Sequence, residues 1–289
     1  MKKLPKIAER LLVFFIGVPL VLSIVLFLPQ KNHLAINVML LALSALGGIE
    51  FTGLLKRKNP HAALSTVEAA LCGVAAPLAM TLIVSFGAPF ALLPVPIVAL
   101  AMWLIMSRTF VAEDALGAAL DAMSAGFATL LYPGFFMAWA IAMMNLPNAG
   151  LIFLVFLLLT LLNDAAAWAF GMLFGKGNQG FIKASPNKSL AGFAGGLVAS
   201  MLIGLGATLF AAPVFTSPLL SAPLAGILTG LATGAAACIG DLGESAMKRS
   251  ANAKDSGALI PGRGGVLDCI DSVCFAAPVY YLMYRLLFV

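Results

Sequence analysis

The chain has 289 residues, of which 62% are hydrophobic and only 10% are charged, and its mean hydropathy is +1.04. Soluble domains carry about 25% charged residues, so this composition excludes a water-soluble globular protein and predicts an all-α integral membrane protein. The net charge of +5 does not indicate nucleic-acid binding. The basic residues stand in short segments between apolar runs and form no stripe with interleaved aromatic residues.

The apolar runs predict nine transmembrane helices. A helix needs about 20 apolar residues to cross the hydrocarbon layer. The three longest runs are divided in two by breaks at Gly87-Ala88-Pro89, at Asn145-Leu146-Pro147-Asn148 and in the region from Pro213 to Pro223. The first run follows a basic stretch and is read as a helix, because no small-residue cleavage site follows it. The predicted helices are 11–29, 33–55, 67–86, 89–107, 120–144, 149–174, 189–212, 219–247 and 265–288.

The basic residues predict an orientation. With the N-terminus in the cytoplasm, all but two of the 17 Lys and Arg residues fall on the cytoplasmic side, the exceptions being Lys31 and Arg285. Cytoplasmic loops of membrane proteins carry an excess of Lys and Arg, and a missed helix would scramble this alternation. We therefore expect a multi-pass protein of the inner (cytoplasmic) membrane whose N-terminus is cytoplasmic.

Small residues recur at four-residue spacing in two predicted helices. Gly192 and Gly196 lie in one of them, and Gly226, Gly230 and Gly234 lie in the next. Such rows allow helix backbones to approach closely. They predict helix packing, either within one chain or in a homodimer.

Acidic residues in apolar helices are costly and point to a functional site. Two pairs here have the i, i+3 spacing that places both side chains on one helix face. For any single pair, an internal ion pair that only holds helices together is the alternative. The five acidic residues that converge on the cytoplasmic side are Asp164, Asp241, Glu244, Asp268 and Asp271.

Two further acidic residues lie in the N-terminal half. Glu50 is within a predicted helix, six residues before Lys56, and suits either a structural hydrogen bond or a supporting role at the site. Glu68 is near a helix end and is expected to be solvated.

The segment between the last two predicted helices combines bases with a glycine-rich turn. Backbone amides beside an arginine and a helix N-terminus predict an anion cradle. The second polar segment, Ser185-Pro186-Asn187-Lys188-Ser189, also precedes a predicted helix. Carboxylates suit Mg²⁺ and bases suit phosphates, so their combination predicts phosphoryl-transfer chemistry. The basic residues and turn glycines of the first segment are Lys248, Arg249, Lys254, Arg263, Gly264 and Gly265.

These motifs resemble the phosphatidate cytidylyltransferases, also called CDP-diacylglycerol synthases. The upstream family element is similar to Asp164, Gly175-Lys176 and the segment 185–189. The similarity covers residues 160–275, and the N-terminal half matches only in being apolar helices. The C-terminal family signature is matched in order by Asp241, Lys248-Arg249, Lys254-Asp255, Pro261-Gly262-Arg263-Gly264-Gly265 and Asp268-Cys269-Ile270-Asp271.

The resemblance implies an enzyme of phospholipid biosynthesis that transfers CMP from CTP to phosphatidic acid, giving CDP-diacylglycerol and pyrophosphate. It implies Mg²⁺ as cofactor and leaves a second cation open. The partners would be CTP, phosphatidic acid and membrane lipid, without nucleic acid, at a site facing the cytoplasm. We expect one membrane-embedded unit with N-terminal helices in 1–145 and a catalytic region in 146–289.

The resemblance also implies roles for particular residues. Those implied for catalysis are Asp241, Asp268, Lys248 and Arg249. Those implied for substrate binding are Ser185, Lys188, Ser189, Lys254, Arg263, Gly264 and Gly265. Those implied for metal binding are Asp241, Asp268, Asp164, Glu244 and Asp271.

Two positions depart from the family pattern. Arg263 replaces the usual His, and Cys269 replaces the usual Arg. Arginine can only donate hydrogen bonds, whereas histidine can also accept them, which leaves a divergent or inactive paralogue open. A membrane transporter or ion carrier that uses intramembrane carboxylates is the alternative from another class. Against it, the acidic residues cluster toward one face and no internal repeat is found.

Overall fold

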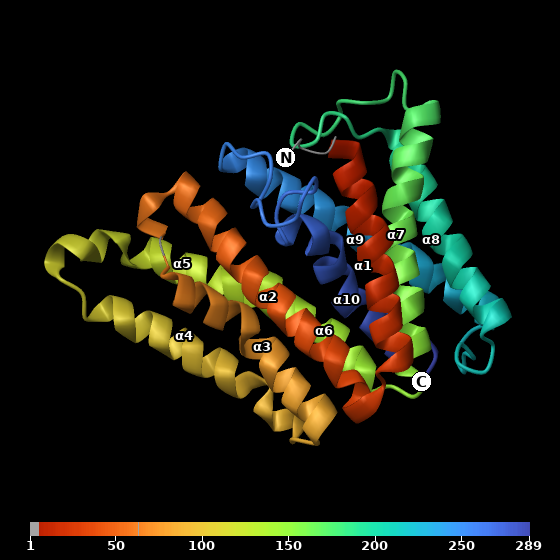
Figure 1. Ribbon diagram of the computed structural model, residues 1–289, viewed down its shortest axis with the longest axis horizontal. Helices are drawn as coiled ribbons and strands as arrows, with labels where there is room; N and C mark the ends of the chain where they lie inside the picture. Colours follow the sequence, from red (N-terminus) through yellow and green to blue (C-terminus); the bar gives the residue numbers. More distant parts are fainter. Residues whose placement is uncertain (1–5, 63) are drawn as a thin grey trace. The chain divides into compact units, whose positions relative to one another are not determined.

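A computed structural model describes residues 6–62 and 64–289 and builds them from helices and connecting segments (Figure 1). No β-strand forms in these ranges, which confirms the predicted all-α class. Seven helical segments are long and apolar enough to cross a membrane. They are Gln30–Lys58, Thr66–Phe86, Phe90–Thr109, Leu116–Asn145, Ala149–Phe174, Leu190–Phe210 and Ala222–Ser250.

The chain forms two compact units. The first consists of Met1–Asn145 and Met247–Ile270, and the second of Leu146–Ala246 and Asp271–Val289. Helices of the first unit are α1 (Lys6–Phe27), α2 (Gln30–Lys58), α3 (Thr66–Phe86), α4 (Pro94–Thr109), α5 (Ala119–Thr129) and α6 (Phe136–Ala142). Those of the second are α7 (Ala149–Phe174), α8 (Leu190–Phe210), most of α9 (Ala222–Ser250) and most of α10 (Leu267–Leu287).

The first and last predicted spans correspond to α1 and α10. α1 contains the apolar stretch Phe15–Phe27 but is not one of the seven segments, and α10 carries three charged side chains, Asp268, Asp271 and Arg285. The count of nine spans and the orientation therefore stay predictions. Lys2 and Lys3, which contribute to the predicted orientation, lie outside the described residues.

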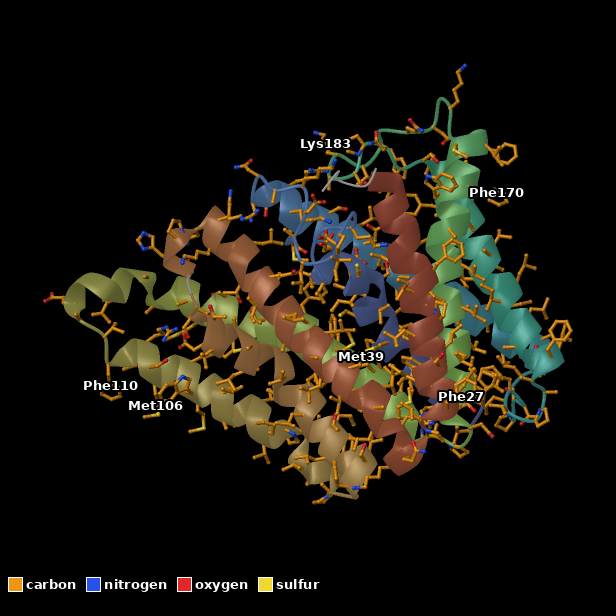
Figure 2. The ribbon with its side chains drawn as sticks, viewed as in Figure 1. Phe27, Met39, Met106, Phe110, Phe170 and Lys183 are labelled. Carbon is orange, nitrogen blue, oxygen red and sulfur yellow. The ribbon has the colours of Figure 1, made fainter. Side chains whose placement is uncertain are left out.

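Large apolar side chains are exposed along the helices, as expected of surfaces that face lipid. Phe27, Met106, Phe110 and Phe170 are examples (Figure 2). Lys183, in contrast, lies in the polar segment between α7 and α8 (Figure 2). Apolar side chains thus cover the helices and charged side chains gather in the connecting segments, as the hydropathy of the sequence predicts.

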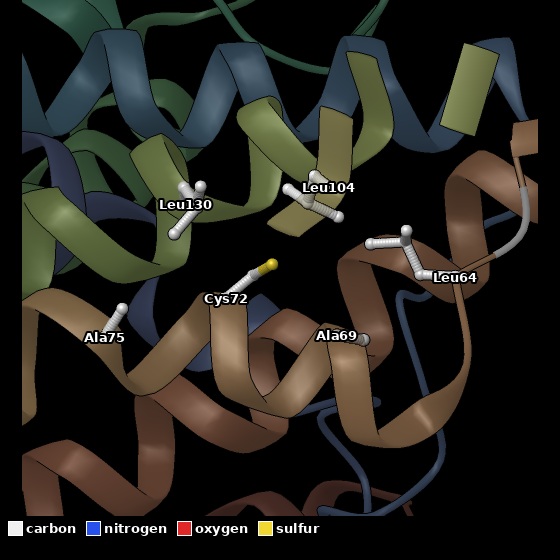
Figure 3. Packing of buried hydrophobic residues seen from close by; sticks show 6 residues of the cluster. All are labelled: Leu64, Ala69, Cys72, Ala75, Leu104 and Leu130. Atoms are coloured by element: carbon white, nitrogen blue, oxygen red, sulfur yellow. The ribbon is translucent and has the colours of Figure 1, made fainter. Parts of the chain in front are cut away.

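Helices α2 and α3 approach closely because glycine occupies their contact. A side chain at Gly73 would overlap the carbonyl oxygen of Ser44, and one at Gly48 would lie 2.6 Å from the carbonyl oxygen of Ala69. Small residues at helix contacts in membranes permit this approach. On the other side of α3, Cys72 packs toward Leu104 and Leu130 in a buried cluster of the first unit (Figure 3).

The start of α3 corrects the expectation that Glu68 is solvated. Its carboxylate accepts a hydrogen bond from Ser65 N at 2.9 Å, and Ser65 Oγ accepts from Glu68 N at 3.2 Å, forming a capping box. Glu68 also pairs with Arg108 at 2.9 Å, and its side chain is only 18% exposed. Helix propagation from a satisfied first turn explains why α3 starts where the sequence predicts.

The predicted helix 120–144 is not a regular α-helix. A π-helical segment, Leu130–Phe135, separates α5 from α6 and contains Pro133. Proline lacks the N–H of a regular turn and its ring clashes with the preceding carbonyl, which favours the wider π geometry. The Ser44 hydroxyl lies within hydrogen-bonding reach of Pro133 O, a contact from α2.

In the second unit, α7 and α8 run side by side (Figure 1), and α9 packs against α8 through glycine. A side chain at Gly226 would overlap Gly204 O, and one at Gly230 would overlap Ser200 O. The glycine rows therefore pack helices within this chain, as the first of the two predicted alternatives states. The buried Asn163 side chain lies beside this contact and donates to Ser200 Oγ at 2.9 Å.

Aromatic residues anchor α10 in the second unit. Tyr280 donates to Ile152 O at 3.0 Å, and Tyr284 donates to Val214 O at 2.9 Å. Phe215 packs edge-on against Tyr284, with ring centroids 5.5 Å apart. Buried tyrosines usually find such partners, and these fix the later turns of α10.

Candidate functional site

In the first unit, the site is organised around the Asp268 carboxylate at the start of α10. Its Oδ1 accepts from Lys248 Nζ at 2.5 Å, and its Oδ2 accepts from Ser256 N at 2.8 Å, Ser256 Oγ at 2.7 Å and Gly265 N at 2.7 Å. The side chain is only 6% exposed. A carboxylate has about four lone-pair positions, so these donors satisfy Asp268 and stabilise its ionised form.

The turn that carries Arg263 is built from backbone hydrogen bonds. Arg263 N and Gly264 N both donate to Ile260 O, at 3.1 and 3.0 Å, and Ile260 N donates to Gly264 O at 2.8 Å. Gly262 and Gly264 have positive φ angles of 71° and 106°. Glycine adopts these angles without the penalty of a Cβ atom, which explains the composition of the turn.

Several amides in and just after this turn already have acceptors inside the protein. Gly265 N donates to Asp268, Gly264 N donates to Ile260 O, and Leu267 N donates to Glu50 Oε2 at 2.8 Å. Substrate binding by Gly264 and Gly265 stays a prediction, but their amides already have partners inside the protein. Phosphate recognition here would therefore fall to side chains.

The basic side chains next to Asp268 differ in exposure. Lys248 is 14% exposed and held by Asp268. Arg249, Lys254 and Arg263 are exposed, and Arg249 Nη1 donates to Ala253 O at 3.3 Å. Exposed bases around a buried ion pair can neutralise the phosphates of a bound substrate.

Glu50, for which the sequence left open a structural hydrogen bond or a supporting role at the site, lies beside this cluster in the first unit. It extends from α2, and its Oε2 accepts from Leu267 N at 2.8 Å and lies 3.2 Å from Ser256 Oγ. The signal that singled it out in the sequence is a carboxylate inside an apolar helix. Nothing in the sequence indicates its partners, which lie more than 200 residues away.

In the second unit, the Asp241 carboxylate of α9 forms an ion pair with Lys188, and both side chains are partly exposed. Lys188 also stands over the ring of Phe193, 5.8 Å from its centroid. Ser189 is buried, and its hydroxyl accepts from Gly192 N at 3.1 Å as the N-cap of α8. Ser185 lies in the preceding turn, where its carbonyl accepts from Lys188 N at 3.1 Å.

The remaining acidic candidates occupy different environments in the second unit. Asp164 is exposed on α7, whereas Glu244 and Asp271 are buried. Asp271 Oδ1 accepts from Ser272 N at 2.5 Å. The metal-binding roles expected for these three residues stay predictions.

The donor set can be compared with the needs of Mg²⁺. Within the ranges 6–62 and 64–289, no group of three or more His, Cys, Asp or Glu side chains could hold a metal ion. Mg²⁺ often takes only one or two carboxylates and completes its octahedron with phosphate oxygens and water. Asp241 and the Oδ1 atom of Asp268 would meet this requirement if a cation replaced the lysine ammonium group that each now accepts from.

Comparison with known proteins identifies related chains. The model of the cytidylyltransferase family matches residues 8–287. The chain is 40% identical over 141 residues to the uncharacterized protein YnbB of Escherichia coli (strain K12), covering 49% of this chain and 45% of YnbB.

Two enzymes are also similar. The phosphatidate cytidylyltransferase of Synechocystis sp. is 42% identical over 138 residues, 45% of each chain. The phosphatidate cytidylyltransferase of Bacillus subtilis (strain 168) is 35% identical over 164 residues, 56% of this chain and 58% of the relative. The chain thus spans about half the length of the curated relatives it matches.

Proposed function

Because the chain belongs to the cytidylyltransferase family, we propose that it is a phosphatidate cytidylyltransferase, which transfers CMP from CTP to phosphatidic acid. Two relatives carry that name, and the order of the motifs between Asp164 and Asp271 supports the same activity. The observation that carries the proposal is the buried Asp268 carboxylate, held by Lys248 and by three donors from the adjoining segment. Such preorganised charge suits phosphoryl transfer.

In the proposed reaction, an oxygen of the phosphatidate phosphate attacks the α-phosphorus of CTP. A new P–O bond forms, the bond to the β-phosphate bridging oxygen breaks, and pyrophosphate leaves. No protein nucleophile is needed. Catalysis then consists of positioning the two substrates and balancing their charge.

The side chains have defined tasks in this scheme. Lys248 and Lys188 exchange their carboxylate partners for phosphate oxygens when the substrates bind, and the exposed Arg249 and Arg263 neutralise further phosphate charge. Lys254, on the same connecting segment, adds to this basic surface. Substrate binding thus draws on bases that the structure holds beside carboxylates or at the surface.

We assign cation binding to Asp268 and Asp241, the acidic residues of the matched family motifs, and keep Asp164, Glu244 and Asp271 as further candidates. When bound there, Mg²⁺ would supply positive charge that stabilises the transferred phosphoryl group. A second cation stays open in this proposal.

We also propose the membrane arrangement that the basic residues predict. Nine spans with a cytoplasmic N-terminus in the inner membrane would put the polar segments 175–188 and 248–265 in the cytoplasm. CTP is soluble there, and the phosphatidate headgroup lies at the same interface.

The activity is tested with purified full-length protein in phosphatidate-containing liposomes supplied with CTP and Mg²⁺. We expect CDP-diacylglycerol and pyrophosphate to appear in equal amounts. The Bacillus subtilis relative serves as the positive control. If folded protein forms no CDP-lipid while that control does, the proposed activity is wrong, and ion flux into the same liposomes would then test the transporter alternative.

A further inference from the structure

The Glu50 carboxylate connects an N-terminal helix to the segment that holds Asp268. Its Oε2 accepts from Leu267 N, the first residue of α10, at 2.8 Å, and lies 3.2 Å from Ser256 Oγ. The first N–H groups of a helix have no partner within the helix. Glu50 supplies one of the missing acceptors at the N-terminus of α10, where the helix dipole favours a negative charge.

Ser256 links this carboxylate to Asp268. Its hydroxyl is 2.7 Å from Asp268 Oδ2 and 3.2 Å from Glu50 Oε2, and its backbone N–H donates to Asp268 at 2.8 Å. Ser256 is buried, with 5% of its surface exposed. The positions of the two carboxylates are therefore coupled through one side chain.

Two glycines show how tightly Glu50 is enclosed. A side chain at Gly257 would overlap the Glu50 carboxylate, and so would one at Gly265. Neither glycine has a positive φ angle, so their backbone conformations do not require glycine. The space occupied by Glu50 does require it.

We propose that Glu50 is a positioning residue, which holds the segment 251–266 and the start of α10 so that Asp268 and Lys248 keep their orientation. Its effect on turnover rests on the proposed function, whereas its effect on the segment does not. Glu50 acts as a hydrogen-bond acceptor, because Leu267 N and Ser256 Oγ both donate to its Oε2 atom.

The first experiment compares Glu50→Ala with Glu50→Gln in the full-length protein. Glutamine keeps one oxygen that can accept from Leu267 N, whereas alanine keeps none. Residues that orient a site typically change activity about 10- to 100-fold when they are lost. We expect that loss for Glu50→Ala and activity within about threefold of wild type for Glu50→Gln.

Amide hydrogen exchange gives a readout that needs no substrate. Without the acceptor, Leu267 N–H and Gly265 N–H should exchange about tenfold faster in Glu50→Ala, and Glu50→Gln should restore slow exchange. Glu68→Ala is the matched control, since Glu68 also accepts from a helix start but in α3. It should leave exchange in 251–267 unchanged.

A double-mutant cycle tests the enclosure. Gly257→Ala should reduce activity and speed exchange when Glu50 is present, and should have no further effect in the Glu50→Ala background. Gly53→Ala, also in the first unit, meets no atom within 4 Å and serves as the control.

Three results would overturn the inference. They are wild-type exchange in Glu50→Ala, equal defects in Glu50→Ala and Glu50→Gln, and an equal effect of Gly257→Ala in both backgrounds. If wild-type protein forms no CDP-lipid but the exchange results hold, the proposed function fails and the positioning of the segment by Glu50 stands.

Discussion

At the scale of single residues, Asp268 is the most constrained group of the candidate site. Four donors surround a side chain that is 6% exposed. The charge of Lys248 depends on it, because a buried ammonium group needs an opposite charge nearby. Replacement of Asp268 therefore affects two charges at once.

We expect Asp268→Asn to lower the turnover number by about 10²- to 10³-fold, the usual loss for a preorganised electrostatic group. The asparagine side chain is neutral, and its NH₂ group would face another donor, either Lys248 Nζ or the backbone N–H groups of Ser256 and Gly265. The rate of CDP-diacylglycerol formation per folded protein, quantified by size-exclusion chromatography, measures the effect. Glu113→Gln, an exposed acidic residue of the first unit, is the control, and a rate for Asp268→Asn within threefold of wild type would refute the assignment.

Arg263 offers a second test at this scale. Its side chain is exposed, and only its backbone N–H takes part in the turn, so Arg263→His should leave the turn intact. An exposed charge contributes up to about 1 kcal/mol, which corresponds to a two- to fivefold rise in KM for CTP at pH 8. The change should shrink at high salt. A rise in kcat of tenfold or more would instead show that arginine impairs this site.

Residue types and their order along the chain could be predicted, but their partners could not. The motifs singled out Asp268, Lys248, Asp241 and Lys188, and the structure pairs them as Asp268 with Lys248 and Asp241 with Lys188. Local spacing cannot reveal these pairs, because the second one joins residues 53 positions apart. Nor could the sequence show that amides of the predicted anion cradle already have acceptors, because one of these, Glu50, comes from a distant helix.

At the scale of secondary structure, apolar run length predicted the helices well. The expected helix 149–174 matches α7, Ala149–Phe174, and 67–86 matches α3, Thr66–Phe86. The π-helical segment around Pro133 was not predicted. In a membrane, neighbouring helices can satisfy the groups that proline frees, so proline alone does not show whether a helix ends or only changes its turn.

Glycines of α8 and α9 allow a prediction at this scale. A side chain at Gly230 would overlap Ser200 O, whereas one at Gly206 would meet only Phe210, at 3.8 Å. Gly230→Ala should destabilise the protein by about 1–3 kcal/mol. Gly206→Ala should be neutral or stabilise it by up to about 1 kcal/mol, because alanine is favoured within helices.

Thermal unfolding in detergent, followed by tryptophan fluorescence, compares these two variants. The Gly230→Ala midpoint should fall clearly below that of wild type, and the Gly206→Ala midpoint should not. Equal midpoints for the two variants would show that the α8–α9 contact contributes little to stability.

At the scale of the whole molecule, composition alone predicted an all-helical membrane protein. It could not predict that residues 247–270 belong to the same compact unit as residues 1–145. That grouping depends on contacts such as Glu50 with Leu267, which join positions 217 apart. Hydropathy carries no information on such pairs.

The proposed odd number of spans predicts opposite locations for two points in the chain. Alkaline phosphatase, which is active only outside the cytoplasm, should be inactive when fused after Lys58 and active when fused after Val289. Green fluorescent protein at the same sites should give the reverse pattern. If both fusion sites have the same location, the count of nine spans is wrong, or α1 or α10 does not cross the membrane.

The divided first unit has a consequence for biogenesis. A ribosome adds about 5–20 residues per second, so roughly 10–40 s pass between the synthesis of Glu50 and that of its partner Leu267, 217 positions later. During that time the Glu50 carboxylate is in a newly inserted apolar helix without its native acceptor contacts, a costly arrangement in lipid. Nascent chains that stall before Leu267 should therefore be recognised by membrane proteases, and insertion factors that shield α2 should raise the yield of folded protein.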